Sequence, residues 1–165
     1  MDERIREALH TAYTGEAKAA LRLKLYAEKA DKEGYAQVAK LFRVISFSEE
    51  IHGKRALRLL KDVGNTEENL RLSFESEQNV AEVAYSEMVK LANDRGDSSS
   101  ALHFSQSRDV EEVHAKLYKS ALDDMMQDRM QEYFVCSVCG YVAEDAVPDV
   151  CPVCGVSKEK FIHFE

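Results

Sequence analysis

The same arrangement of acidic and histidine residues occurs twice in this chain. In each copy a single glutamate is followed, 33 or 34 residues later, by a second glutamate that begins a Glu-x-x-His sequence. That separation suits the two arms of a helical hairpin, and a spacing of three residues places Glu and His on one helix face. The six residues are Glu16, Glu49 and His52, then Glu77, Glu111 and His114. Four carboxylates and two imidazoles in a helix bundle predict a site for two metal ions.

The four glutamates lie in the middle of apolar stripes with helical spacing, where a side chain facing a bundle core is normally apolar. Ordinary surface glutamates are the alternative for any one position, since 30 of the 165 residues are acidic. Four buried carboxylates would repel one another or take up protons, and two cations remove that cost. Oxygen-rich ligation with one imidazole per ion favours iron or manganese over zinc.

The first 130 residues contain no proline, which suits long helices. Polar breaks containing glycine, at residues 31–34, 63–66 and 93–98, divide this region into four helical segments. We expect Asn65 or Thr66 to cap the third segment and Ser98–Ser100 to cap the fourth. The chain is therefore predicted to be mainly α, with a four-helix domain over residues 1–130 and a small second domain over residues 131–165.

All four cysteines lie in the predicted second domain, as Cys136-x-x-Cys139 and Cys151-x-x-Cys154, each pair followed by glycine. Two such turns give tetrahedral sulfur coordination, which fits zinc or a single iron. Two disulfides are disfavoured because the N-terminus lacks the apolar stretch of an export signal. A structural zinc ribbon and an iron site stay open on the ligands alone. Nearby aromatic residues are expected to pack around the site: Tyr133, Phe134, Tyr141, Phe161 and Phe164.

The composition narrows the classes of partner. The net charge of −8 disfavours binding to nucleic acid or to an anionic membrane surface. No apolar run approaches the roughly 20 residues that a membrane-spanning helix needs. A cytoplasmic location is the default expectation.

Taken together, these features resemble the rubrerythrins, in which a ferritin-like di-iron domain precedes a rubredoxin-like domain. The resemblance covers nearly the whole chain, through Thr14–Ala17, Phe42–His52, Val63–Leu70, Glu111–Tyr118 and the two cysteine pairs. It implies a ferritin-like four-helix bundle, a di-iron centre on the six Glu and His residues, and one iron on the four cysteines, for which zinc can substitute. Tyr85 matches a family tyrosine that hydrogen-bonds near the metals; a packing aromatic is the alternative.

The resemblance also implies an activity. Family members of this kind are non-haem peroxidases that reduce hydrogen peroxide to water in oxidative-stress defence. Electrons would come from NAD(P)H through a reductase or a rubredoxin, and pass through the four-cysteine iron. A ferroxidase that oxidises ferrous iron with oxygen is the first alternative, and a non-enzymatic helical bundle with a zinc ribbon is the second.

One position departs from the best-known family pattern. Those proteins carry a further glutamate one turn after the third-helix ligand, and it competes with the second-helix histidine for one iron. Here that position is Val80, which cannot bind a metal. We therefore expect His52 to stay bound in both redox states, and the departure makes the ferroxidase alternative more credible.

The connection between the second and third helices, residues 62–67, is short. A ferritin-like bundle with these helices parallel needs a crossover of roughly 30 Å, whereas six residues reach at most about 21 Å. Either the helices run up-down-up-down in one chain, or the two hairpins belong to different bundles of a domain-swapped homodimer. We favour the swapped dimer.

Overall fold

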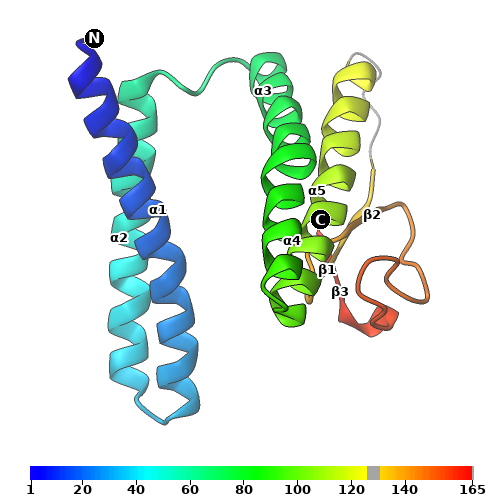
Figure 1. Ribbon diagram of the computed structural model, residues 1–165. Helices are drawn as coiled ribbons and strands as arrows, with labels where there is room; N and C mark the ends of the chain where they lie inside the picture. Colours follow the sequence, from blue (N-terminus) through cyan, green and yellow to red (C-terminus); the bar gives the residue numbers. More distant parts are fainter. Residues whose placement is uncertain (126–130, 165) are drawn as a thin grey trace. The chain divides into compact units, whose positions relative to one another are not determined.

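The structure, a computed structural model, describes residues 1–125 and 131–164. It separates into two compact units, Met1–Gly64 and Asn65–Glu165 (Figure 1). The domain boundary expected after residue 130 falls at the edge of residues 126–130, outside the described residues. That boundary therefore stays a prediction.

Unit 1 is a helical hairpin of α1 (Glu3–Lys32) and α2 (Ala36–Leu60), which lie side by side in Figure 1. The Asp2 side chain caps α1 by accepting a hydrogen bond from the Arg4 backbone N–H at 2.9 Å. The seam between the helices consists of small residues, which allow the two backbones to approach closely: Ala20, Ala27 and Ala30 on α1, and Ala39, Ser46, Gly53 and Ala56 on α2. The buried Ser46 hydroxyl donates to the Ala20 carbonyl at 2.8 Å.

Many of the larger apolar residues of unit 1 are exposed, although Leu60 is buried. Four of them on the helices that carry Glu16 and Glu49 are between 40% and 59% exposed: Ile5, Leu41, Ile45 and Leu59. Leu9, Ala12 and Leu59 line a groove together with Glu16 and His52. The ligand-bearing face of this hairpin is thus apolar and uncovered within unit 1.

Unit 2 begins with one helical run, made of α3 (Thr66–Asn79), the π-helix η1 (Val80–Tyr85) and α4 (Ser86–Asp94). It packs against α5 (Ser98–Asp124). Asn65 caps α3, as expected, in a capping box with Glu68 whose two hydrogen bonds measure 2.8 and 2.9 Å. The expected serine cap of α5 is wrong, because the Asp97 carboxylate takes that place and accepts from the Ser100 N–H at 3.0 Å.

The rest of unit 2 is a three-stranded antiparallel sheet in the order β2-β1-β3. Its strands are β1 (Tyr133–Cys136), β2 (Val142–Glu144) and β3 (Phe161–Phe164), with a short 3-10 helix, η2 (Lys158–Lys160), before β3. The expected aromatic packing forms in part: Tyr141 and Phe161 meet edge to face at 6.2 Å, whereas Phe164 is 58% exposed. We call this part, residues 131–164, the cysteine module.

Candidate metal centres

The first predicted ligand group lies in unit 1. Glu16 comes from α1, and Glu49 and His52 come from α2, with their ligand atoms all within 4.8 Å of one another. His52 Nδ1 lies 3.1 Å from Glu49 Oε2 and 3.8 Å from Glu16 Oε1. Nitrogen and oxygen ligands that share one ion at about 2.0–2.2 Å are separated by no more than about 4.4 Å. These three side chains therefore fit a common ion.

The second predicted ligand group lies in unit 2 and has the same composition. Glu77 comes from α3, and Glu111 and His114 come from α5, again within 4.8 Å of one another. His114 Nδ1 lies 2.8 Å from Glu111 Oε2. The six predicted ligands are therefore brought together as two groups of three, one in each unit.

The paired carboxylates carry a shared electrostatic signature. The pKa of Glu16 is raised, first by a side-chain hydrogen bond with Glu49 and then by burial and the charge of Glu49. The pKa of Glu77 is raised first by burial, and then by a hydrogen bond with Glu111 and its charge. Each pair thus retains a proton more readily than separate carboxylates would. A cation can replace that proton and cancel the repulsion, so both groups fit iron chemically.

The two histidines differ in their surroundings. His114 Nε2 lies 3.3 Å from the carbonyl oxygen of Gly140, which directly follows Cys139 in the cysteine module. If Nε2 carries the proton and donates it to this carbonyl, the Nδ1 lone pair is free for a metal. Among the described residues, no such backbone hydrogen bond is found for His52, whose side chain is 50% exposed against 27% for His114.

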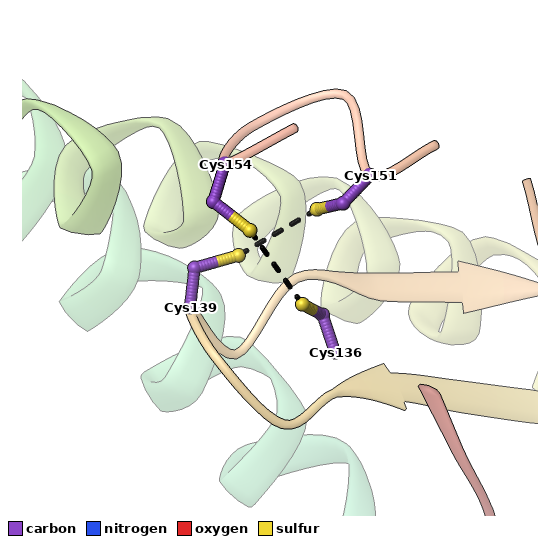
Figure 2. Close-up of side chains that lie close together, drawn as sticks. All are labelled: Cys136, Cys139, Cys151 and Cys154. Carbon is purple, nitrogen blue, oxygen red and sulfur yellow. Dashed lines mark hydrogen bonds between the residues drawn. The ribbon is translucent and has the colours of Figure 1, made fainter. Parts of the chain in front are cut away.

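The four cysteines form a compact sulfur cluster between two turns of the cysteine module (Figure 2). The Sγ atoms of Cys136 and Cys154 lie 3.7 Å apart, as do those of Cys139 and Cys151. Sulfurs at the corners of a tetrahedron, each about 2.3 Å from a central ion, are separated by about 3.8 Å. The cluster therefore fits one tetrahedral metal ion.

The backbone of each turn supports the thiolates. Gly140 and Gly155 adopt positive φ angles of 84° and 74°, and their N–H groups donate to the carbonyls of Cys136 and Cys151 at 2.9 Å. Burial raises the pKa of Cys136, but the N–H groups of Cys139 and Val138, together with the side chains of Cys154 and Cys139, outweigh it and lower this pKa to about 7. Burial raises the pKa of Cys139 and Cys154. A cation is needed to hold the full set as thiolates.

The other predicted positions are placed as follows. Tyr85 ends the π-helix, and its ring centre lies 6.4 Å from that of Phe104 on α5. Val80 begins the π-helix. Glu50, the residue after the ligand Glu49, pairs with Lys24 Nζ at 2.7 Å. The contact between His114 and Gly140 had no sequence signal, because it joins residues from separate motifs.

Comparison with known proteins places both parts of the chain. The family profile described as rubrerythrin matches residues 7–122, and that of the rubrerythrin rubredoxin-like domain matches residues 134–162. Rubrerythrin-2 of Clostridium acetobutylicum is 28% identical over 94% of this chain and 94% of its own. Rubrerythrin of Porphyromonas gingivalis is 30% identical over 87% of this chain and 81% of its own.

Solved structures agree with these matches. A partially reduced state of nigerythrin is 26% identical, with a TM-score of 0.58 over 96% of this chain and 86% of that one. A fully reduced, all-ferrous state of nigerythrin gives a TM-score of 0.60 at 24% identity, over the same shares, and supports the fold alone. The predicted fold class is confirmed: the chain is mainly helical and ferritin-like, with a C-terminal rubredoxin-like domain. The predicted cofactors, a di-iron carboxylate centre and a four-cysteine iron site, are also confirmed. Among the described helices, none has the length and apolar composition needed to cross a bilayer.

Proposed function

Because the chain belongs to the rubrerythrin family, we propose that it is a cytoplasmic non-haem peroxidase that reduces hydrogen peroxide to water. NAD(P)H is the distant electron source, through a reductase or a rubredoxin that delivers electrons to the four-cysteine site. The peroxidase activity, this electron route and the catalytic roles of the six Glu and His residues and Tyr85 are parts of the proposal. When bound, the two irons would supply the two electrons that, together with two protons, reduce hydrogen peroxide to two waters, and the four-cysteine iron would return electrons one at a time.

The observation that carries the proposal is the His114–Gly140 contact. It joins a ligand of the di-iron centre to the residue after Cys139, across a single 3.3 Å step from Nε2 to a carbonyl oxygen. The rest of the connection is covalent, through the backbone of Gly140 and Cys139. Such a link gives a redox module a short route to a peroxide-reducing centre, whereas a zinc ribbon used only for binding has no use for it.

The protein's own side chains have distinct tasks in this proposal. Each carboxylate pair accepts a cation where it otherwise retains a proton. The Gly140 carbonyl fixes the tautomer and orientation of the His114 ring. The N–H groups of Val138 and Cys139 that point at the Cys136 thiolate would stabilise the more negative, reduced state of an iron bound at the cysteine site. Since Val80 offers no carboxylate, His52 stays bound in both redox states.

We further propose that each di-iron centre is completed across a domain-swapped homodimer. Each unit supplies three ligands, and the ligand face of unit 1 is apolar and exposed. α2 ends at Leu60 and α3 begins at Thr66, so five residues connect them. Five residues reach at most about 18 Å, whereas the 25 residues of α2 extend about 37 Å. The connection is therefore too short for a parallel crossover. In this proposal, the helices α3 to α5 of a second copy cover the exposed ligand face of unit 1.

Sedimentation tests this assembly. The metal-loaded protein should behave as a particle of twice the 18.7 kDa chain mass. A fully loaded monomer at micromolar concentration would contradict the proposed dimer.

Stopped-flow oxidation tests the activity. The fully reduced protein, with its iron content measured, is mixed separately with hydrogen peroxide and with oxygen. The peroxidase proposal requires faster oxidation by peroxide. Oxidation by oxygen at the same or a greater rate, with turnover of added ferrous iron, would instead support a ferroxidase, which the valine at position 80 favours.

A further inference from the structure

Unit 1 has a second groove, on the side of the α1–α2 seam away from the ligand face. This outer groove has a volume of about 280 Å³, and its apolar walls include Tyr13 and Leu57. Gly53, which is buried in the seam, also lines it, and so does the ligand Glu49. The carboxylate of Glu49 lies 3.1 Å from His52 Nδ1. Glu49 therefore connects the outer groove with the first ligand group.

A corresponding groove lies between the helices of unit 2, with a volume of about 270 Å³. Each of its lining residues follows a counterpart in unit 1 by 61 residues on the first helix or by 62 on the second, the same offsets that separate the two ligand groups. Three of the corresponding pairs are Tyr13 and Phe74, Gly53 and Ala115, and Lys54 and Lys116. Among the described residues that line the groove of unit 2, however, Glu111 is absent. Only the groove of unit 1 extends to a ligand carboxylate.

The glycine at position 53 accounts for this difference. Gly53 lies inside α2 with an ordinary helical backbone, where glycine weakens a helix relative to alanine. A Cβ at this position would meet side-chain atoms of Tyr13 and Glu16 at 3.7 Å, which is an ordinary van der Waals distance. Alanine would therefore fit, as Ala115 does in unit 2. What the glycine provides is open space between Tyr13 and Glu16, one helical turn from Glu49.

The rim of the outer groove carries more positive than negative charge. Glu50 lies 2.7 Å from Lys24 Nζ and 3.6 Å from Lys54 Nζ, so two ammonium groups flank one carboxylate. Once a metal ion neutralises Glu49, this rim disfavours the entry of a further cation and admits a neutral molecule or an anion. A water molecule occupies about 30 Å³, so the groove has room for a molecule of the size of hydrogen peroxide.

We propose that the outer groove of unit 1 is the entrance through which hydrogen peroxide reaches the di-iron centre, and that Gly53 keeps this entrance open. The partner in the proposed dimer covers the ligand face of unit 1, so the outer groove is the side from which a small molecule can approach the first ligand group. The identity of the substrate rests on the proposed peroxidase function. The entrance itself can be tested with a probe that is not turned over.

Azide, a small anion that binds ferric iron, is that probe. The full-length ferric protein is mixed with azide, and the absorbance of bound azide gives the association and dissociation rates by stopped flow. Gly53→Ala should lower both rates several-fold and leave the dissociation constant unchanged, because a narrower entrance slows passage in both directions without altering the bound state. The rate constant for oxidation of the reduced protein by hydrogen peroxide should also fall. An unchanged rate with peroxide would overturn the assignment of the entrance to peroxide.

Gly15→Ala is the matched control. It makes the same substitution on α1, where no atom lies within 4 Å of the added Cβ. Its azide rates should equal those of the parent. Equal rates in Gly53→Ala and Gly15→Ala would overturn the proposal. A changed dissociation constant in Gly53→Ala would also overturn it, since the added methyl group would then act on the ligands and not on the entrance.

Two charge reversals locate the entrance without changing a buried residue. Lys54→Glu and Lys116→Glu alter corresponding, exposed positions at the rims of the two grooves. Lys54→Glu should slow azide association, most strongly at low ionic strength, whereas Lys116→Glu should leave it unchanged. Equal effects of the two variants would contradict an entrance in unit 1. A protein that lacks peroxide turnover but shows the expected azide rates would refute the peroxidase proposal and leave the entrance standing.

Discussion

The two ligand groups have the same three residue types, but the protein supports them differently. In unit 1, Glu16, Glu49 and His52 lie on an exposed face of the helical hairpin, and the His52 side chain is half exposed. In unit 2, the ring of His114 contacts both Glu111 and the Gly140 carbonyl. The second group is therefore oriented before metal binds, whereas the first has less support from the described residues of its own unit. The cysteine module contacts only the second group among the described residues.

Replacing each histidine in turn gives the largest effects. His52→Ala and His114→Ala each remove a ligand, and both should lower peroxide turnover by about 100-fold or more, since even supporting residues of metal ligands are worth 10–100-fold. Only His114→Ala should also loosen the cysteine module. Hydrogen exchange of residues 137–142 distinguishes the two variants. Equal hydrogen-exchange protection of these residues in the two variants would show that His114 does not hold the cysteine module in place.

The two glycines of the cysteine turns form a matched pair. Gly140→Leu and Gly155→Leu both force a side chain into a positive-φ position, at about 1–2 kcal/mol each. A Cβ at Gly140 would lie 3.8 Å from Val110 on α5, whereas no atom lies within 4 Å of one at Gly155. Gly140→Leu should therefore push the module from His114 and slow electron transfer between the iron sites about 10-fold.

The matched variant supplies the control. Gly155→Leu should lose similar stability and keep the transfer rate, as measured by stopped-flow absorbance of the cysteine-bound iron. Equal transfer rates in the two variants would exclude a role for the His114–Gly140 contact.

Substitutions of the residue that caps α3 should have a smaller effect, on the stability of the second unit. Asn65→Ala removes the capping box of α3 and should lower the free energy of unfolding by about 1 kcal/mol. Asn65→Asp keeps a capping oxygen and should remain near the parent. Chemical denaturation measures both. A similar loss for Asn65→Asp would show that the amide acts through something other than the cap.

The smallest effect concerns pH in the metal-free protein. The pKa of Glu77 is raised in the folded state, so its contribution to stability is complete below the unfolded pKa and is lost as pH rises through the folded value. The Tm of the parent should thus fall relative to that of Glu77→Gln over this rise in pH. Adding metal should raise the Tm of the parent above that of Glu77→Gln, because only the parent keeps all three side chains of this ligand group. If the Tm of the metal-free parent instead rose with pH relative to that of Glu77→Gln, folding would lower the pKa of Glu77 and not raise it.

Sequence reasoning found the features set by local chemistry. The four helical segments, the Asn65 cap, both ligand groups and the sulfur cluster follow from spacing and residue type. The capping of α5 was missed because aspartate and serine compete for the same role, and Asp97 lies one residue earlier. The π-helix was missed because one extra residue barely disturbs an apolar pattern. Contacts between motifs, such as that of His114 with Gly140, depend on tertiary packing and leave no local pattern.

The central claim is that two half-sites from different chains make one di-iron centre, and mixing two inactive variants tests it most directly. One variant, Glu49→Ala with His52→Ala, lacks the first group; the other, Glu111→Ala with His114→Ala, lacks the second. In a swapped heterodimer one bundle is doubly defective and the other is intact. Unfolding and refolding the two together should therefore restore about a quarter of the di-iron centres and of the peroxide turnover. A mixture as inactive as either variant alone would show that both groups come from one chain.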